Sequence, residues 1–408
     1  MKILQINTVY REKSTGRTCV EVEKALEKYG HSSITAYGTG KKENSPNAYL
    51  IDSRFEYLMH NVLSKITGLE GYFSIIPTIR LICFMKKYAP DIVHLRNIHG
   101  HFLNLPLLFW YLKKANIPVV QNLHDCWAYT GGCCYYTTRN CYKWKKQCAN
   151  CPRDKRDYPE SLFFDFSRKA FKDKQRWYAS LSNLHVIGVS KWVSNQAKES
   201  FLGSAKTVSY IYNWINRDVF HPGENDNAVR EKYGIPKNKF VVIGVSAQWN
   251  IGSPRYEDFM KMASLIGEDT VIVMVGKSND IPQSEKIIHI PFISDTNELA
   301  RLYSCADVYV HCSIEDTFGK VIAEAMACGT PVVVYDVTAC AELVKEGCGY
   351  AIEPRNIDQV LKSIEKIKND GKEKYSQNCV QNVAGNFDFE TNTKKLIDLY
   401  STIIAERN

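Results

Sequence analysis

The sequence predicts an α/β protein made of two halves, each with a parallel β-sheet covered by helices on both faces. Short apolar runs alternate with amphipathic stretches along the chain, and polar turn residues with Pro222 interrupt this alternation at 213–222 before it restarts. Apolar runs that lack polar alternation and are separated by helical stretches are typical of parallel strands buried on both faces. A chain of 408 residues is too long for one core and suits two domains.

The first half contains the first set of predicted strands and helices. Residues 19–29 have the apolar spacing of a helix that ends at Gly30, and further helices are expected at 105–115 and from Lys191 onward. The expected strands are residues 3–6, 34–37, 92–95, 119–123 and 184–189. We assign residues 1–216 to this domain, with a cysteine-rich insertion at 126–160.

The second half repeats the pattern. The expected strands are residues 240–245, 270–275, 287–290, 308–311 and 332–334. We assign residues 217–385 to the second domain and 386–408 to a C-terminal helix. Since ligands bind beyond the carboxyl ends of the strands in open α/β sheets, two such halves joined by a hinge favour a ligand cleft between them.

Composition excludes several classes of protein. The chain is 45% hydrophobic and 24% charged, as in folded globular proteins. Its first apolar run is too short for a signal peptide, and the longest apolar patches are interrupted by polar residues or proline, so neither spans a bilayer. We therefore expect a cytoplasmic protein. Neither half carries a G-x-G-x-x-G, so no nicotinamide cofactor is expected.

Positive charge concentrates at residues 139–156 in a chain of formal net charge +8. Seven lysines and arginines lie there with Asp154 as the opposing charge, and Trp144, Tyr142 and, just before the segment, Tyr135 and Tyr136 are interleaved. Nucleic-acid binding, attraction to anionic lipid headgroups or a pyrophosphate-linked acceptor, and a plain solvated face are three open interpretations. Because no nucleic-acid recognition motif accompanies the segment, we expect no nucleic-acid partner.

The most informative stretch is residues 313–331. Asp316 lies at the expected start of a helix, Glu324 follows eight residues later, and Gly329 and Pro331 end the helix before a strand. The free N–H groups of a helix N-terminus suit a phosphate or sugar oxygen. A carboxylate among alanines at Glu324 needs a partner such as a ribose diol. The simpler alternative is that Asp316 and Thr317 only cap the helix and Glu324 is a surface residue.

A family resemblance rests on residues 316–331, which read D-T-F-G-K-V-I-A-E-A-M-A-C-G-T-P. The stretch resembles the E-x7-E signature of retaining, nucleotide-sugar-dependent glycosyltransferases of family 4, with Asp316 where that family usually has Glu. The resemblance covers nearly the whole chain and is closest to enzymes of colanic-acid and exopolysaccharide type. It implies the GT-B fold: two Rossmann-like domains facing across a cleft, with the C-terminal helix crossing back onto the first domain.

The resemblance also implies an activity. The expected reaction is retaining transfer of a hexose from a nucleoside diphosphate sugar to a growing surface polysaccharide or lipid-linked oligosaccharide, without a cofactor for catalysis. The expected partners are the donor and a glycan or lipid-linked acceptor, with peripheral contact at the inner face of the plasma membrane. Asp316, and the absence of the family's usual Arg-Lys pair, motivate the alternative of a catalytically weak or inactive protein that binds nucleotide sugar or glycan.

In the first half, the resemblance assigns site residues at two strand ends and one loop. Gly16 matches a glycine loop that lets the backbone approach the donor diphosphate, although a glycine in a strand-to-helix turn is also structural. His124, in N-L-H-D-C-W, is the expected catalytic residue that hydrogen-bonds the donor sugar. Asp125, Asn97 and His99 are the expected substrate-binding residues on the acceptor side.

In the second half, the resemblance assigns the donor site. Arg255 is the only cation where the family holds the diphosphate, so it takes that role. Gly276, at a strand end, is expected to face the nucleotide base, and Asp316 is expected at the sugar hydroxyls as the second catalytic residue. The other expected donor-binding residues are Thr317, Phe318, Gly319, Lys320 and Glu324.

Five cysteines form a separate group between residues 133 and 151. A Cys-x2-Cys with further cysteines upstream, in a chain expected in the cytosol, indicates metal binding before disulfides, and four thiolates suit tetrahedral zinc. A similar run in colanic-acid-type relatives implies Cys133 rather than Cys134 as a ligand. The predicted structural zinc site is therefore Cys133, Cys141, Cys148 and Cys151, and four free thiols are the alternative.

Overall fold

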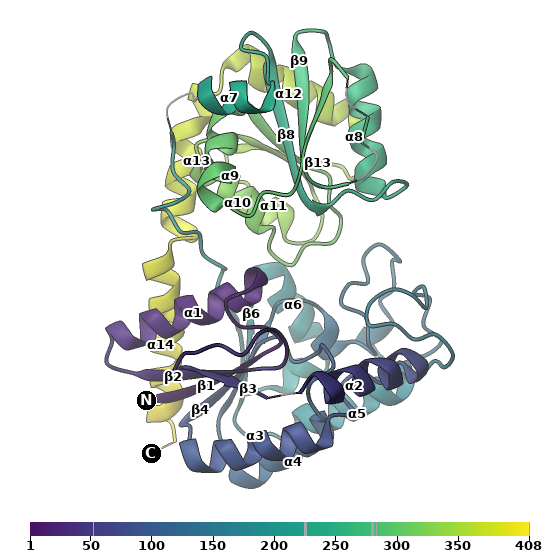
Figure 1. The fold of residues 1–408 in the computed structure, drawn as a ribbon, viewed down its shortest axis with the longest axis vertical. Coiled ribbons are helices and arrows are strands. Elements are labelled where there is room, and N and C mark those ends of the chain that lie inside the picture. The colour runs from purple at the N-terminus through teal and green to yellow at the C-terminus, as the bar shows by residue number, and fades with distance from the viewer. Residues whose placement is uncertain (52, 224–226, 279–280, 283, 408) are drawn as a thin grey trace. The chain divides into compact units, whose positions relative to one another are not determined.

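The computed structural model describes residues 1–51, 53–223, 227–278, 281–282 and 284–407. It divides into unit 1, Met1–Ile211 with Thr393–Asn408, and unit 2, Tyr212–Asn392 (Figure 1). Each unit contains one sheet, and all pairings between the named strands are parallel. The predicted fold class, two Rossmann-like parallel-sheet domains, is confirmed.

The sheet of unit 1 has seven strands in the order β3-β2-β1-β4-β5-β6-β7. The chain builds outward from β1 in one direction and then from β4 in the other, so the strand order reverses between β1 and β4. Ligands of open α/β sheets bind at this kind of reversal. The strands are β1 (Lys2–Asn7), β2 (Ser32–Tyr37), β3 (Ala48–Leu50), β4 (Ile92–Leu95), β5 (Val119–Leu123), β6 (Leu184–Gly188) and β7 (Thr207–Tyr210).

Helices cover both faces of this sheet. Helix α1 packs on β1 and β2, α6 packs on β6 and β7, and α3, α4 and α5 pack beside one another (Figure 1). The C-terminal helix α14 joins unit 1, where the hydroxyl of Tyr400 lies 2.5 Å from Nδ1 of His94. The helices are α1 (Lys13–Lys28), α2 (Arg54–Thr67), α3 (Ile75–Tyr88), α4 (Leu105–Ala115), η1 (Trp127–Tyr129), η2 (Lys143–Lys145), α5 (Ser167–Ala179), α6 (Lys191–Glu199), η3 (Phe201–Ser204) and α14 (Phe389–Ala405).

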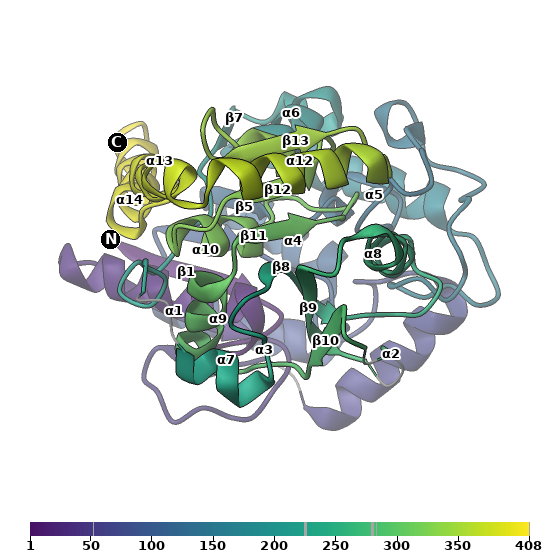
Figure 2. The same cartoon turned by 90° about the horizontal axis from the view of Figure 1, so that it is seen from above.

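The sheet of unit 2 has six strands in the order β10-β9-β8-β11-β12-β13, and its order reverses between β8 and β11. Figure 2 shows α8 and α9 on opposite faces of this sheet. The strands are β8 (Phe240–Gln248), β9 (Thr270–Lys277), β10 (Ile287–Ile290), β11 (Val308–His311), β12 (Val332–Tyr335) and β13 (Gly349–Ile352). The helices are α7 (Asn227–Tyr233), α8 (Pro254–Leu265), α9 (Thr296–Cys305), α10 (Lys320–Ala327), α11 (Cys340–Leu343), α12 (Ile357–Asp370) and α13 (Glu373–Asn386).

The two units meet in sequence near the segment expected to be a hinge. The structure divides the chain after Ile211, whereas we expected the division after residue 216. Residues 213–222 lie in unit 2, where the ring of Trp214 packs edge-on against Phe389 and Ile215 pairs with Asp388. No helix within the described ranges is long and apolar enough to cross a membrane.

Candidate functional site

A close backbone approach marks the carboxyl ends of β8 and β9 in unit 2. Gly276 has a φ of +143°, and a Cβ built on it would lie 2.0 Å from the carbonyl oxygen of Ser246. Any side chain here would collide with the backbone of β8, so glycine is required. The carbonyl of Gly276 accepts a hydrogen bond of 2.8 Å from Nε2 of His289.

Arg255 spans the reversal point of the unit 2 sheet. From the first turn of α8, its guanidinium donates to Oγ of Ser246 on β8 at 2.8 Å and to Oγ of Ser313, after β11, at 2.7 Å. Its buried Nε has no hydrogen-bond partner among the described residues. Since both partners are neutral hydroxyls, the guanidinium keeps its charge available for an anion at the place where open sheets bind ligands.

Asp316 lies beside this arginine in a chain of polar contacts. Its Oδ2 is 2.8 Å from Nε2 of His311, whose Nδ1 is 2.8 Å from the hydroxyl of Tyr309. Burial acts to raise the pKa of Asp316, but the charge and hydrogen bond of His311, followed by Ser313 and Arg255, bring it below its ordinary value. The Asp316 carboxylate is therefore ionised at neutral pH.

The N-cap residue of helix α10 is a glycine. Gly319 has a φ of +78° and offers no side-chain hydrogen bond to the helix. Glu324 is only 9% exposed and is not a surface residue. The part of the simpler alternative that makes Glu324 a surface residue therefore does not hold. Lys320, the first residue of α10, adds a positive charge at its N-terminus.

Thr317 and Phe318 are buried in the loop before α10. The ring of Phe318 packs against Phe387 at 5.5 Å and Tyr212 at 6.1 Å between centroids. These contacts fix the loop that carries Asp316 and Gly319, so the Phe318 side chain serves packing.

In unit 1, a shallow recess lies at the carboxyl ends of β4 and β5. Its lining includes Asn97, His99, His124 and Asp125. Burial, followed by the positive charge of Arg96, lowers the pKa of His124 to about 3. The imidazole of His124 is therefore neutral at physiological pH and carries one N–H donor.

The carboxylate of Asp125 is hydrogen-bonded to His99 and to the backbone of Trp127. Its Oδ2 lies 2.7 Å from Nε2 of His99, and its Oδ1 accepts from the backbone N–H of Trp127 at 2.8 Å. Burial acts to raise the pKa of Asp125, but the charge and hydrogen bond of His99 bring it below its ordinary value. Nδ1 of His99 lies 2.9 Å from the hydroxyl of Tyr158, so the row of contacts runs Asp125–His99–Tyr158.

Asn97 and Gly16 lie near the reversal point of the unit 1 sheet. The backbone N–H of Asn97 donates to Oδ1 of Asn7 at 3.1 Å, which ties the end of β4 to the end of β1. Gly16 is buried in the first turn of α1, and a Cβ there would meet the backbone of Tyr10 and Arg11 at 3.1–3.2 Å. Gly16 therefore lets the loop after β1 pack closely against α1.

Among the five cysteines at residues 133–151, which we call the cysteine segment, Cys134 lies apart from the other four. Those four cysteines line one small recess of about 20 Å³, whereas Sγ of Cys134 lies 4.0 Å from Nε2 of His99. The backbone N–H of Gly131 donates to Sγ of Cys148 at 3.2 Å. The groups of metal-ligating side chains gathered within 4.8 Å in the described ranges do not include the four thiols. The four that share the recess are Cys133, Cys141, Cys148 and Cys151.

The basic segment 139–156 is partly neutralised by ion pairs. Arg139 pairs with Asp157 at 3.0 Å, and Lys145 pairs with Glu199. The ammonium of Lys145 also lies over the rings of Tyr142 and Trp144. These contacts favour a solvated face for this part of the segment.

Sequence reasoning did not anticipate several partners of the site residues. Tyr158 reaches His99 from a loop 59 positions away, and Ser313 reaches Arg255 across 58 positions. No local pattern reveals contacts of this range. His311 is different, because a histidine at the last position of a buried strand is a signal for the edge where ligands bind.

The chain matches two family models. Residues 15–219 match the family described as Glycosyltransferase Family 4, and residues 227–385 match Glycosyl transferases group 1. A curated relative, the putative colanic acid biosynthesis glycosyl transferase WcaC of Escherichia coli (strain K12), is 22% identical over 375 residues, which cover 88% of this chain and 89% of that one. The O-antigen chain mannosyltransferase RfbU of Salmonella typhimurium is 27% identical over 45% of this chain and 51% of that one.

Solved structures share the fold at low identity. Anabaena Alr3699/HepE in complex with UDP-glucose aligns with a TM-score of 0.67 at 15% identity, covering 98% of this chain and 100% of that one. A glycosyltransferase from Rickettsia africae aligns with a TM-score of 0.66 at 19% identity, covering 99% and 98%. With the two parallel sheets, these likenesses confirm the GT-B fold class.

Proposed function

We propose, because the chain belongs to glycosyltransferase family 4, that it transfers a hexose from a nucleoside diphosphate sugar to a growing surface polysaccharide or lipid-linked oligosaccharide, with retention of configuration. The colanic-acid and O-antigen relatives support this class of product. The neighbours crystallised with UDP and UDP-glucose support the class of donor.

Arg255 is the observation that carries the donor assignment. A guanidinium hydrogen-bonded to two serine hydroxyls at the β8/β11 reversal presents positive charge there, with the carboxylate of Asp316 nearby. We infer that it binds the donor diphosphate, with Lys320 and the amides at the start of α10 beside it. Glu324 then accepts hydrogen bonds from the ribose, and Gly276 leaves room for the base.

The proposed chemistry needs no covalent intermediate. Asp125 is engaged by His99, and Asp316 pairs with His311, so neither carboxylate is free to act as a nucleophile. The bond between the sugar's C1 and the phosphate oxygen breaks as the acceptor oxygen bonds C1 from the same face. The departing phosphate takes the acceptor's proton. Arg255 stabilises the charge on that phosphate, Asp316 holds sugar hydroxyls, and His124 donates its N–H to the sugar.

Calorimetry of UDP and GDP binding tests the donor site. Arg255→Ala removes a charged hydrogen-bond donor and Glu324→Ala a charged acceptor, and each change is expected to weaken the preferred nucleotide by roughly 1.5–3 kcal/mol. Arg355→Ala is the matched control, since Arg355 pairs with Asp258 at 3.5 Å in the same unit. Unchanged affinity in the Arg255 and Glu324 variants would reject the assignment.

A catalytically weak or inactive sugar-nucleotide-binding protein is the second candidate. The observation that favours it is Asp316, whose short side chain is already engaged by His311. A nucleotide-release assay across UDP- and GDP-sugars separates the two candidates. Binding without release would support the second.

We also propose one structural zinc ion in the cysteine segment. Support comes from four thiols that line one recess and from the N–H of Gly131 that donates to Sγ of Cys148, because backbone N–H groups commonly support metal-bound thiolates. Tetrahedral zinc requires sulfurs about 2.3 Å from the metal, so the four thiols would draw closer together on binding. The metal would hold the segment that presents Tyr158 to His99.

A further inference from the structure

Helix α2 turns polar side chains toward the core of unit 1 and apolar side chains outward, the reverse of a typical surface helix. Its buried residues are His60 and Ser64. Its outward stripe is apolar: Phe55 is 72% exposed, Val62 54% and Leu58 50%, with Met59 and Ile66 also exposed. A surface helix ordinarily buries its apolar stripe against the core, whereas this stripe is exposed among the residues of unit 1 that the structure describes.

Hydrogen bonds fix α2 in this orientation. Nδ1 of His60 lies 2.7 Å from Oγ of Ser74, and Ser64 donates to Oε2 of Glu70 at 2.9 Å. Glu70 also accepts from the backbone N–H groups of Gly100 and His101 at 2.9 and 2.7 Å. Rolling the helix to bury its stripe would break the contacts of His60 and Ser64 and leave these two buried polar side chains without their partners. The outward stripe is therefore a property of the fold.

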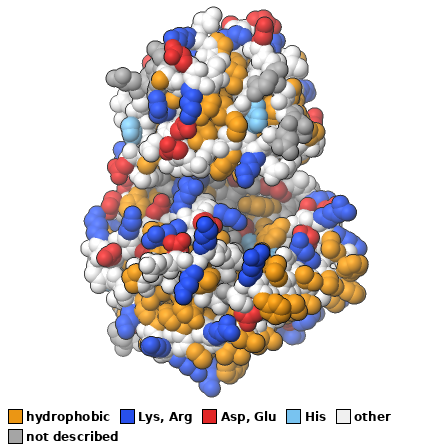
Figure 3. All heavy atoms as spheres, in the orientation of Figure 1, with side chains coloured by type: hydrophobic (Ala, Val, Ile, Leu, Met, Phe, Trp, Pro, Cys, Tyr) orange, Lys and Arg blue, Asp and Glu red, His pale blue; other side chains and the backbone are white. Residues whose placement is uncertain are grey.

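Two neighbouring segments extend the stripe. At the start of α3, Ile75, Ile76 and Ile79 are exposed, and the ion pair of Arg80 with Glu56 at 3.5 Å joins α3 to α2. In the loop 161–166, Phe163, Phe164 and Phe166 are exposed, and the N–H of Leu162 donates to the carbonyl of Lys65 in α2 at 2.8 Å. Figure 3 shows hydrophobic side chains gathered at this lower right part of unit 1, with lysine and arginine side chains among them.

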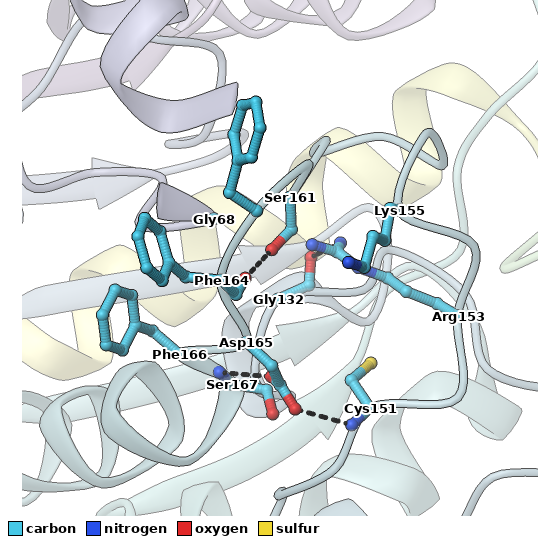
Figure 4. Close-up of a pocket in the computed structure, with 12 residues that line it drawn as sticks. Gly68, Gly132, Cys151, Arg153, Lys155, Ser161, Phe164, Asp165, Phe166 and Ser167 are labelled. Carbon is cyan, nitrogen blue, oxygen red and sulfur yellow. Dashed lines mark hydrogen bonds between the residues drawn. The ribbon is translucent and has the colours of Figure 1, made fainter. Parts of the chain in front are cut away.

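A pocket of about 220 Å³ at the end of α2 combines aromatic and cationic walls. Figure 4 shows Phe164 and Phe166 on one side and Arg153 and Lys155 on the other. The two phenyl rings stack at 5.6 Å, and Arg153 donates to the carbonyl of Gly132 at 3.0 Å. Apolar rings beside cations match the boundary between acyl chains and anionic headgroups.

We propose that the apolar surface formed by the outward stripe of α2, the start of α3 and the loop 161–166 binds an anionic lipid bilayer. The aromatic and aliphatic side chains enter the acyl boundary, and Arg153 and Lys155 meet lipid phosphates. The charge complementarity and the aromatic residues beside cations favour a bilayer over a second protein surface, since protein interfaces are depleted of lysine. The surface lies within unit 1, and its lipid binding does not depend on the transfer reaction.

Vesicle co-sedimentation tests the surface. The wild-type chain is expected to sediment with phosphatidylcholine–phosphatidylglycerol vesicles (molar ratio about 7:3) at least about tenfold better than with phosphatidylcholine alone, since each basic residue near the surface adds attraction to anionic lipid. The double variant Leu58→Ser/Val62→Ser is expected to lose about tenfold or more of this binding. Lys155→Ala is expected to reduce the preference for the anionic vesicles.

The double variant Ile251→Ser/Leu265→Ser is the matched control, because these unit 2 side chains are 59% and 53% exposed. It is expected to sediment like the wild type. Circular dichroism and thermal unfolding, measured on every preparation, show that a variant is folded, and nucleotide release reports transfer separately. A wild-type chain that stays in the supernatant with anionic vesicles, or a Leu58→Ser/Val62→Ser chain that binds them like the wild type, overturns the proposal. The proposal is also overturned if the wild-type chain is a dimer that Leu58→Ser/Val62→Ser dissociates, because the surface would then bind a second copy of the chain.

Discussion

Single side chains near the strand ends owe their protonation states to their neighbours. His124 is neutral because burial, and then the charge of Arg96, lower its pKa to about 3, whereas Asp316 stays ionised. A neutral imidazole donates an N–H to a sugar hydroxyl without adding positive charge beside a sugar that becomes cationic in the transition state. These two states are the ones that the proposed reaction requires.

Replacing His124 tests its role. His124→Ala is expected to lower turnover by about 10²-fold, since misplacing a reacting sugar costs about that much, while UDP or GDP affinity stays near that of the wild type. Steady-state kinetics and calorimetry measure the two quantities. His221→Ala, at an exposed histidine of unit 2, is the control. Near-normal turnover of His124→Ala would remove this residue from the mechanism.

Glu23 predicts how the stability of unit 1 depends on pH. Burial raises its pKa from 4.5 to about 7, although it accepts hydrogen bonds from Thr35 at 2.5 Å and Tyr10 at 2.9 Å. The folded chain therefore holds this proton more tightly than the unfolded chain does. The stabilising contribution is complete below about pH 4.5 and is lost as the pH rises through about 7.

Denaturant unfolding at pH 5 and pH 8 measures this contribution. Relative to Glu23→Gln, the wild type is expected to lose about 2–3 kcal/mol of unfolding free energy between the two pH values. Glu21→Gln, at a neighbouring position on α1, is the control and should follow the wild type. Parallel pH dependence of the wild type and Glu23→Gln would show that Glu23 ionises normally in the folded chain.

At the scale of elements, the sequence predicted buried strands well. The bounds expected for β4, β5, β10 and β11 agree with the structure, because continuous apolar runs between polar turns have one plausible placement. Helix α2 was not predicted, since its apolar residues face outward and its buried positions are His60 and Ser64. A pattern search assumes that apolar residues are buried, so it has no signal for such a helix.

The candidate site also has a part that the sequence predicted and a part that it did not. The spacing of Asp316 and Glu324 was visible because both lie on one local strand–loop–helix unit. The sequence did not reveal the hydrogen bonds of Arg255 to Ser246 and Ser313. It also did not reveal the contact of Tyr158 with His99. These contacts depend on how separate elements pack. The roles of the assigned residues stay predictions that the variants above test.

The cysteine segment yields a prediction at this scale. Protein purified without added metal is expected to contain about one zinc per chain by elemental analysis. Cys148→Ser should lower the zinc content, and Cys134→Ser should leave it unchanged because that thiol lies beside His99 instead. Less than about one-tenth equivalent of zinc, with all thiols freely titratable, would reject the site.

At the scale of the whole molecule, the same arrangement occurs twice. Each unit has an all-parallel sheet whose strand order reverses once, between β1 and β4 and between β8 and β11. The polar residues that we assign to the site lie just after the carboxyl ends of strands or on the helices α8 and α10, which follow β8 and β11, as expected for open α/β sheets. The family matches over both halves fit this repeated design.

The central claim is retaining transfer from a nucleoside diphosphate sugar, and a proton NMR time course of the wild-type chain with UDP- and GDP-sugars tests it most directly. The spectra report donor loss and the configuration of the anomeric carbon in the first product. We expect one donor to be consumed and an α-linked donor to give an α-configured product, because attack from the face that the phosphate leaves preserves configuration. A β-configured first product, or no consumption of any donor, would contradict the account.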